Sequence, residues 1–390
     1  MTFDAGFPIL AALVPLSLFF SEVRITEVKI MDFLIEEVMD SMYDWVRVLD
    51  RNDNIVYANK AMTGALNTSL IGRKCYEVLG RSSPCENCIS RKAVFCGTPH
   101  KKEEIIGGRI FSVMSTPLKN KNNEVAYVVE VLRDITELKE LQNKILEQNK
   151  KLQDDLSLAR KLQCSMLPVE IQDDRLSFSF IYRPCETLGG DFLDIFRIDE
   201  DHVGIYIADV SGRGVSASML TIFLRSTINK NTLSPAEALG DLYKSFSSNN
   251  FGQDLYITVF YAVINTRDMI MTYSNAGHNV PTIVFNKDRF ELLRVPGIPI
   301  SDWVDEPGYQ DKTIQLKKDD MVFFFTDGIV EMRSKTGEEF GEERLLKLLN
   351  TGVEPSSVLN NIIKSLYDFA GIDSTQAIPD DVTMALLKIN

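Results

Sequence analysis

The sequence is poor in cysteine and in basic residues, and it holds only one long uncharged run. Six cysteines in 390 residues are too few for a disulfide scaffold. Forty-two Lys and Arg face 55 Asp and Glu, and the net charge of -13 has the wrong sign for a protein that grips nucleic acid. With 45% hydrophobic residues, 22 Gly and 14 Pro, the chain is neither collagenous, disordered nor a multi-span membrane protein. Its length predicts two domains and a connector.

The uncharged run covers residues 5–20 and contains Pro8 and Pro15. As a helix it would reach about 24 Å, which is short of a hydrocarbon core of about 30 Å. It also lacks the positive segment of a signal peptide. Two interpretations of residues 1–30 therefore stay open: a weak membrane tether, or an extension ahead of a true start at Met31. We otherwise expect a cytoplasmic protein.

Residues 31–136 predict a small α+β domain with an amphipathic helix at its start. A hairpin over residues 45–57 precedes two longer strands, 109–118 and 124–132, which are separated by a turn. The hairpin pattern D-x-x-x-x-I-x-x-x-N and the D-I-T after the last strand resemble a PAS domain. This resemblance implies a five-stranded antiparallel sheet with flanking short helices, serving as a sensory or dimerising module.

Residues 137–167 predict a linker helix, because they contain neither Gly nor Pro. Their apolar residues recur three, four and seven positions apart, at Leu138, Leu141, Ile145, Leu152, Leu156 and Ala159. This spacing favours a coiled coil with a second copy in a homodimer. The alternative is a single helix that lies on the next domain. Pro168 ends the helix.

Residues 168–390 alternate strand-like and helical runs, and acids recur at the ends of apolar runs. The acids are Asp191 in GGDFLD, Asp209 in IADVSG, Asp327 in FTDG and Asp380 in DDVT. Carboxylates gathered together repel one another, and Mg²⁺ or Mn²⁺ suits a shell of carboxylate, carbonyl and water. Two such ions could activate a water for in-line attack on phosphorus. Taken alone, each motif is more often a simple turn.

Taken in order, the acid motifs and their neighbours form a set that is similar to the SpoIIE-type serine phosphatases of the protein phosphatase 2C superfamily. The set is GGDFLD, IADVSGRGV, ITVFY, NAGHN, GIP, FFTDGIVE and DDVT. Residues 159–168 also resemble the A-x-x-x-Q-x-x-x-L-P helix that enters this domain in the family. The resemblance covers residues 155–390 and implies an α/β/β/α sandwich with metals at one sheet edge. With the PAS-like region, the expected fold class is α+β.

The resemblance also implies a metal site of two Mn²⁺ or Mg²⁺ ions. Asp191 and Asp209 would hold the pair, with Asp209 bridging and the Val210 carbonyl completing one shell. Asp327 and Asp380 would hold the second ion.

Four further motif residues stay open. Asp381 would lie behind Asp380, and Asp194 would orient a coordinated water or cap a turn. Animal members of the superfamily have a histidine where Ser211 stands, so the source of the leaving-group proton is unassigned. His278 could reach the site or pack its own loop.

Four cysteines lie within 22 positions of the PAS-like region, at Cys75, Cys85, Cys88 and Cys96. They could hold Zn²⁺ or an iron–sulfur cluster, or form a reversible disulfide. The segment GRKCYEVLGRSSPCENC resembles a cysteine-bearing variety of PAS domain. Cys96 or His100 could supply a fourth ligand, and buried structural thiols are the alternative.

These features predict a metal-dependent phosphoserine/phosphothreonine protein phosphatase controlled by a PAS sensor through a dimeric helix. The resemblance implies a phosphorylated anti-anti-sigma (STAS) protein as the substrate, so that dephosphorylation frees a sigma factor. The main alternative is a catalytically silent sensory or binding scaffold. A nucleotide cyclase is disfavoured, because GGDFLD lacks the acid that follows GGD in the GGDEF signature.

Overall fold

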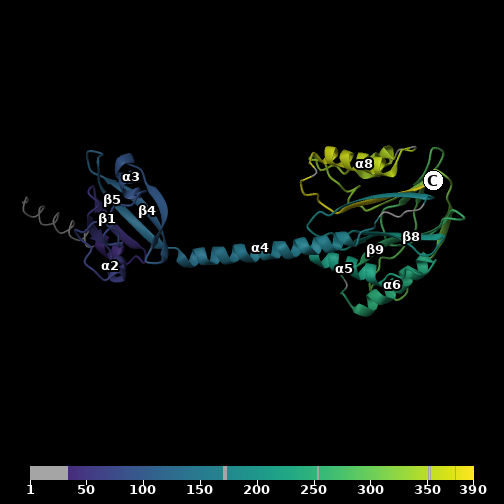
Figure 1. The fold of residues 1–390 in the computed structure, drawn as a ribbon, viewed down its shortest axis with the longest axis horizontal. Helices are drawn as coiled ribbons and strands as arrows, with labels where there is room; N and C mark the ends of the chain where they lie inside the picture. Colours follow the sequence, from purple (N-terminus) through teal and green to yellow (C-terminus); the bar gives the residue numbers. More distant parts are fainter. Residues whose placement is uncertain (1–33, 170–173, 253, 350, 352, 374) are drawn as a thin grey trace, which may run out of the picture. The chain divides into compact units, whose positions relative to one another are not determined.

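The computed structural model describes most of the chain, in two compact units of residues 1–149 and 150–390 (Figure 1). Residues 1–30, predicted as a tether or an extension, lie outside the described residues. None of the helices in the described ranges has the length and apolar character that a bilayer span needs. Those ranges are 34–169, 174–252, 254–349, 351, 353–373 and 375–390.

The first unit is a five-stranded antiparallel sheet of order β2-β1-β5-β4-β3 with short helices, and residues 34–40 form the helix that the sequence predicts ahead of the sheet. The predicted hairpin and the two predicted long strands are confirmed. The elements are β1 (Trp45–Asp50), β2 (Ile55–Ala58), α2 (Lys60–Leu66), α3 (Ile89–Cys96), β3 (His100–Ile106), β4 (Arg109–Lys119) and β5 (Val125–Asp134).

Two polar residues of the hairpin motif fix its shape. Asp50 Oδ1 accepts the backbone N–H groups of Asn52 and Asn54, which closes the turn. The Asn59 side chain accepts the N–H of Met62 and so caps α2. The motif therefore fixes both the turn and the start of the next helix.

A buried ion pair holds the centre of this sheet. Arg47 on β1 and Glu130 on β5 are 4% and 1% exposed, and Arg47 Nε donates to Glu130 Oε2 at 2.8 Å. The hydroxyls of Ser90 on α3 and Ser115 on β4 donate to the other carboxylate oxygen. Burial alone would raise the pKa of Glu130, but the Arg47 charge and these hydrogen bonds lower it below its usual value. The network ties α3 to three strands.

Replacing Glu130 by Gln should lower the free energy of unfolding of this unit by about 3–5 kcal/mol, because a buried guanidinium loses its countercharge. Urea unfolding followed by Trp45 fluorescence in a Trp303→Phe background measures the change. Since the folded-state pKa of Glu130 is depressed, its contribution is present above the unfolded pKa and is lost on acidification. The free energy of unfolding of the variant should not fall in this way on acidification. The exposed Glu77→Gln control should match the wild type. Equal midpoints for all three proteins would contradict the prediction.

The linker helix is present as α4 (Thr136–Ser165). Its apolar side chains Leu138, Leu141, Ile145 and Leu152 are between 52% and 60% exposed in the single chain. Pro168 follows three residues after its last turn. The helix is therefore where the sequence predicts it, and its apolar stripe is open to solvent within the described chain.

The second unit contains two five-stranded antiparallel sheets. The first has the order β13-β10-β9-β8-β7 and the second β12-β11-β14-β15-β6. Their strands are β6 (Leu176–Arg183), β7 (Phe192–Arg197), β8 (His202–Val210), β9 (Ile257–Asn265), β10 (Ile270–Ala276), β11 (Thr282–Phe285), β12 (Phe290–Leu293), β13 (Lys312–Gln315), β14 (Met321–Phe325) and β15 (Val382–Ile389).

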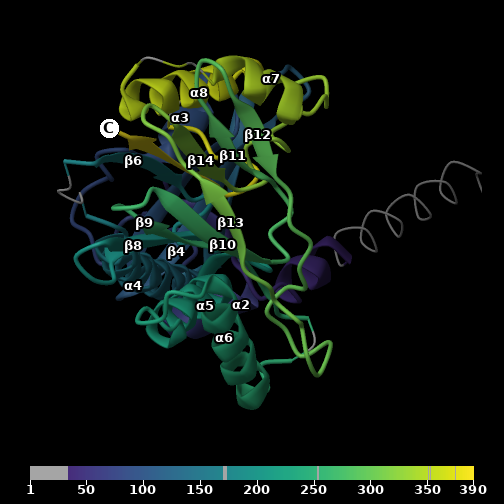
Figure 2. The same ribbon diagram turned by 90° about the vertical axis from the view of Figure 1, so that its right-hand side faces the viewer.

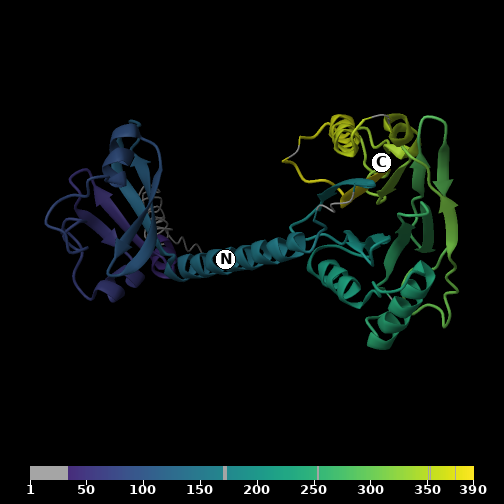
Figure 3. The same ribbon diagram turned by 45° about the vertical axis from the view of Figure 1, so that its right-hand side comes forward.

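The two sheets pack on each other, and helices cover their outer faces (Figures 2 and 3). One apolar cluster joins side chains of both sheets, including Ile207, Phe260 and Phe324. Side chains of α5 (Gly214–Thr227) and α6 (Pro235–Asn249) pack on the first sheet, and those of α7 (Gly341–Leu348) and α8 (Pro355–Ala370) on the second. Strands β8 and β14 are therefore buried on both faces, which explains their unbroken apolar runs.

Candidate metal centre

Two of the predicted acids are neighbours across a strand pair of the first sheet. Phe192 at the start of β7 pairs with Ala208 near the end of β8. Continuing that antiparallel register by one residue places Asp191 beside Asp209. Asp191 is 1% exposed, whereas Asp209 is half-buried.

The other two acids, Asp327 and Asp380, lie just beyond the ends of two paired strands of the second sheet. Phe325 of β14 pairs with Met384 of β15, so Asp327 and Asp380 both lie just beyond the paired residues. The backbone of Gly328 lies so close to the Asp381 carbonyl that a Cβ at this glycine would overlap it. Glycine is therefore required for the two acidic loops to touch.

Hydrogen bonds join the acidic loops of the two sheets. Thr326 Oγ1 donates to Asp191 Oδ2 at 2.8 Å. The Asp381 carboxylate accepts three backbone N–H groups of the loop before β7, from Cys185 at 2.7 Å, Gly190 at 2.6 Å and Asp191 at 3.2 Å. Because its oxygens are occupied in this way, Asp381 positions the Asp191 loop. Its neighbour Asp380 accepts the Asp381 N–H at 2.9 Å and is more exposed, and its role as a metal ligand stays a prediction.

The gathered carboxylates change the pKa values of the most buried members. Burial, followed by the charges of Asp327 and Asp380, raises the pKa of Asp209 to about 8. Burial and the neighbouring charges of Asp209 and Asp381 raise the pKa of Asp191 well above its ordinary value. Burial is the larger cause in both cases and the neighbouring negative charge adds to it, and a bound divalent cation would favour the charged form of both carboxylates.

The donor set fits a Mg²⁺ or Mn²⁺ ion that keeps part of its water shell better than an ion enclosed by protein ligands alone. No three Asp, Glu, His or Cys side chains in the described ranges stand close enough to enclose an ion by themselves. Mg²⁺ usually keeps several waters and takes one or two carboxylates from the protein. A Cβ on Gly190 would lie 3.0 Å from the Val210 carbonyl oxygen, so this oxygen stays accessible because residue 190 is glycine. Carboxylates, a carbonyl and water are thus the ligands that Mg²⁺ or Mn²⁺ could take at this site.

Comparison with known families agrees with this geometry. Residues 39–140 match the PAS fold, and residues 199–390 match the family described as Stage II sporulation protein E (SpoIIE). The chain contains a PAS domain and a SpoIIE-type domain. Asp209, Asp327 and Asp380 fall inside the second match, whereas Asp191 precedes it. The chain as a whole is therefore mixed α/β, with a PAS domain followed by a SpoIIE-type domain.

Curated relatives support the same assignment. Protein IcfG of Synechocystis is 24% identical over 60% of this chain and 42% of its own length. Phosphoserine phosphatase RsbU of Bacillus subtilis is 26% identical over 61% of this chain and 70% of its own length. The SiaA-PP2C domain of Pseudomonas aeruginosa has a TM-score of 0.54 at 17% identity, covering 62% of this chain and 99% of that domain, and it shows the fold alone. The chain thus spans under half of IcfG and more than two thirds of RsbU.

Asp194 of the SpoIIE-type domain is paired with basic side chains at the end of α5 and just beyond it. The side chain is 5% exposed and accepts a hydrogen bond from Lys230, with Arg225 Nε at 3.9 Å. Lys230 Nζ also lies 4.6 Å from the centre of the Phe196 ring. Asp194 therefore forms an ion pair with Lys230 from within strand β7, so it caps no turn, and its expected role toward a coordinated water stays a prediction.

His278 and Ser211 both make hydrogen bonds to protein groups. His278 is 5% exposed, its Nε2 lies 2.9 Å from the Phe325 carbonyl oxygen, and burial lowers its pKa. The Ser211 hydroxyl accepts the Tyr256 N–H at 2.9 Å and donates to the Asp254 carbonyl at 3.4 Å. The His278 ring therefore contacts the end of β14, and its Nδ1 lies 3.4 Å from Thr258 Oγ1 on β9, so the two roles left open for it stay predictions.

Several residues at the site were not found from sequence. Arg213 precedes α5 and donates to Asp380 at 3.2 Å, and Asn279 donates to Asp327 at 2.7 Å. Partial burial and the nearby Asp327 charge raise the pKa of Glu331. Arg213, Asn279 and Glu331 lie within the motifs IADVSGRGV, NAGHN and FFTDGIVE. Their proximity to the acids was not predicted, because the partners of Arg213 and Asn279 are remote in sequence.

Gln163 connects α4 to the Asp191 loop. Its Nε2 donates to the Gly189 carbonyl at 2.8 Å and to Thr221 Oγ1 of α5 at 3.2 Å. Its Oε1 accepts the Gly189 N–H at 3.2 Å. Gln163 is 2% exposed on a helix whose other side chains are mostly open to solvent. It therefore links the end of α4 to two elements of the SpoIIE-type domain.

The four cysteines of the PAS domain are free thiols in different surroundings. Cys75 is buried, and burial raises its pKa to about 12. Cys85 and Cys88 are half-buried and Cys96 is exposed. Since no group of three metal-binding side chains occurs in the described ranges, a Zn²⁺ or iron–sulfur site has no support here.

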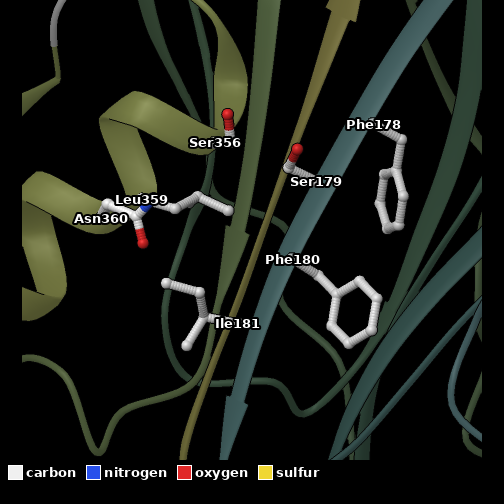
Figure 4. Close-up of a pocket in the computed structure, with 7 residues that line it drawn as sticks. All are labelled: Phe178, Ser179, Phe180, Ile181, Ser356, Leu359 and Asn360. Carbon is white, nitrogen blue, oxygen red and sulfur yellow. The ribbon is translucent and has the colours of Figure 1, made fainter. Parts of the chain in front are cut away.

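A cavity of about 300 Å³ borders the edge strand β6 of the SpoIIE-type domain (Figure 4). In the close-up, Ser179 and Ile181 point toward α8, while Phe178 and Phe180 point to the opposite side of the strand. None of the predicted acids lines it, so it is separate from the candidate metal centre. Its lining residues are Phe178, Ser179, Phe180, Ile181, Ser356, Leu359 and Asn360.

The raised pKa of Asp209 predicts how pH and metal affect thermal stability. A carboxyl whose folded pKa is raised stabilises the fold at low pH, and this contribution is lost as pH rises toward about 8. With chelator present, Tm should therefore fall between about pH 5 and 9, and Mn²⁺ or Mg²⁺ should restore it at the alkaline end. Thermal unfolding across pH, with Asp209→Asn as the comparison, tests this. A metal-free Tm independent of pH and unmoved by metal would contradict it.

Proposed function

We propose that this protein is a metal-dependent protein phosphatase that hydrolyses phosphoserine or phosphothreonine in the SpoIIE-type domain. The observation that carries the proposal is the set of four acids from two sheets, with the pKa of Asp209 raised to about 8 by burial and by its acidic neighbours. The family match and the similarity to a curated phosphoserine phosphatase, RsbU, support it.

In this proposal, Mn²⁺ or Mg²⁺ is held by the carboxylates of Asp191, Asp209, Asp327 and Asp380 and by the Val210 carbonyl. The bound metal pair supplies a nucleophilic water and neutralises charge on the phosphoryl group. The remaining tasks belong to side chains that hold these ligands in place. Thr326 fixes Asp191, Asn279 orients Asp327, and Arg213 contacts Asp380. Because Ser211 and His278 are both engaged, we assign protonation of the leaving oxygen to solvent.

We also propose that the two sheets and their covering helices form the α/β/β/α sandwich of the superfamily. The apolar stripe of α4 would pair with a second copy as a coiled coil. The support is the exposure of Leu138, Leu141, Ile145 and Leu152, since an isolated helix with such a stripe gains by burying it. The PAS domain would then act as a sensor that controls phosphatase activity through α4.

For the substrate, we propose a phosphorylated anti-anti-sigma protein of the STAS class, acting in a partner-switching pathway in the cytoplasm. Six free thiols are typical of a reducing compartment. The experiment compares phosphate release from a phosphoserine STAS protein, a phosphoserine protein of another fold and a phosphotyrosine peptide, each with Mn²⁺. Preference for the STAS protein supports the proposal. Release from the other phosphoserine protein alone would reject the substrate assignment, and release from none would favour the silent scaffold.

A further inference from the structure

A half-exposed aromatic side chain is connected through one neighbouring residue to the loop that follows Asp209. Trp303 lies in the segment between β12 and β13, and it is 50% exposed. Its ring centre is 5.3 Å from that of Tyr256. Tyr256 is joined to Ser211 by two hydrogen bonds, from its N–H to Ser211 Oγ at 2.9 Å and from the Ser211 N–H to its carbonyl at 3.0 Å. Ser211 follows Asp209 by two residues, so Tyr256 links Trp303 to the loop of a proposed metal ligand.

The segment that carries Trp303 is anchored on both sides. The Tyr243 hydroxyl on α6 donates to the Val304 carbonyl at 2.6 Å and accepts the Val304 N–H at 3.1 Å. Ser247 Oγ donates to the Ser301 carbonyl at 3.0 Å. These bonds hold the backbone immediately before and after Trp303. An aromatic side chain on a fixed backbone loses little entropy on binding a partner.

The surroundings of Trp303 define the chemistry of a partner. Val304 is 38% exposed and extends the apolar surface, while Asp305 and Glu306 are exposed acids directly after it. The metal ligands recognise a phosphate but cannot tell one phosphoprotein from another. Discrimination therefore needs contacts outside the phosphate, and Trp is enriched where such contacts contribute most to binding.

We propose that Trp303 and Val304 form a docking surface for the apolar side chain that flanks the phosphorylated serine or threonine of a protein substrate. Asp305 and Glu306 favour a basic residue beside that side chain. This inference rests on the proposed phosphatase function, and it adds the residues outside the metal centre that select the substrate.

The test uses three probes with the full chain and Mn²⁺: p-nitrophenyl phosphate, a phosphoserine peptide flanked by Leu and Lys, and an equally long peptide flanked by Gly and Glu. The wild type should prefer the Leu/Lys peptide by about tenfold in kcat/KM, and Trp303→Ala should abolish that preference, mainly through KM. Phe290→Ala removes an aromatic residue of similar exposure, 49%, from β12 and should keep the preference.

Four outcomes decide whether Trp303 forms the docking surface. Loss of the preference in Trp303→Ala alone supports the docking surface. An equal loss of kcat on all three probes would overturn it, since Trp303 would then only position the Ser211 loop. A wild type without a preference would overturn it as well. If the wild type hydrolyses none of the probes, the proposed function fails first, and the inference fails with it.

Fluorescence gives a readout of contact that does not depend on turnover. The chain has two tryptophans, Trp45 and Trp303, so Trp45→Phe leaves Trp303 as the reporter. In a Trp45→Phe/Asp209→Asn protein, the Leu/Lys peptide should shift the emission of Trp303 at concentrations where the Gly/Glu peptide does not. Identical titrations with both peptides would overturn the proposal.

Discussion

Replacing Asp209 by Asn is expected to slow metal-dependent phosphate release by about 10²–10³-fold, the cost typical of removing one preorganised electrostatic group from an active site. Asp209 is central because it interacts with the other three acids. The charges of Asp327 and Asp380 raise the pKa of Asp209, and the charge of Asp209 raises the pKa of Asp191. Asn keeps the shape but loses the charge, so it removes the proposed bridge between two ions. Release of inorganic phosphate from a phosphoserine protein measures the effect.

A matched control separates the loss of a ligand from a general effect of charge. Asp288 is exposed on the turn between β11 and β12, and Asp288→Asn should keep the wild-type rate. Metal-free Asp209→Asn should also melt no lower than the metal-free wild type, because a buried and repelled carboxylate has been removed. Retention of more than about a tenth of the wild-type rate by Asp209→Asn would contradict its role as a bridging ligand.

Replacing Gln163 by Ala is expected to lower phosphatase activity by about tenfold or more, although Gln163 touches no predicted metal ligand. The change leaves the buried N–H and carbonyl of Gly189 without partners, at a cost of about 1–3 kcal/mol each. Gly189 precedes Asp191 by two residues, and misplacing a site group by about 1 Å can cost 10²-fold in rate. The measurement is kcat with saturating Mn²⁺, together with the metal concentration at half activity.

The control for Gln163 lies on the same helix. Gln153 is exposed on α4, and Gln153→Ala should behave as the wild type does. A Gln163→Ala protein with normal activity and normal metal requirement would show that the Asp191 loop keeps its place without α4. The proposed control of the SpoIIE-type domain through α4 would then lose its structural basis.

The parts of the fold that the sequence predicts well are those with local signals. In residues 45–57 and 109–132, alternating apolar and polar residues and the turn residues between them predict the strands, and these signals act over a few positions. The helix over 136–165 follows from apolar spacing and from the absence of Gly and Pro. The position of the acids at strand ends could also be predicted, because each acid directly follows an apolar run and the strand ends where that run ends.

Residues whose partners are remote in sequence could not be assigned in this way. Asp194 sits within the GGDFLD motif beside Asp191, yet its partner Lys230 is 36 residues away on the far side of α5. Arg213 meets Asp380 across 167 positions. Such contacts depend on how the sheets and helices pack, and local patterns do not encode that packing.

The cysteines show the same limit in the PAS domain. Spacing suggested a shared site, but Cys75 lies in the core while Cys96 lies at the exposed end of α3. Where each side chain points depends on the strand or helix that carries it. A cluster in sequence therefore did not become a metal cluster in space.

Metal-dependent phosphate release by the wild type is the most direct test of the central claim. The full chain, treated with chelator and dialysed, is incubated with a phosphoserine protein while Mn²⁺ or Mg²⁺ is titrated back. The account predicts no release without metal, saturable release with it, and loss of that release in Asp327→Asn. Release that persists in chelator, or an Asp327→Asn protein as active as the wild type, would contradict the two-metal phosphatase.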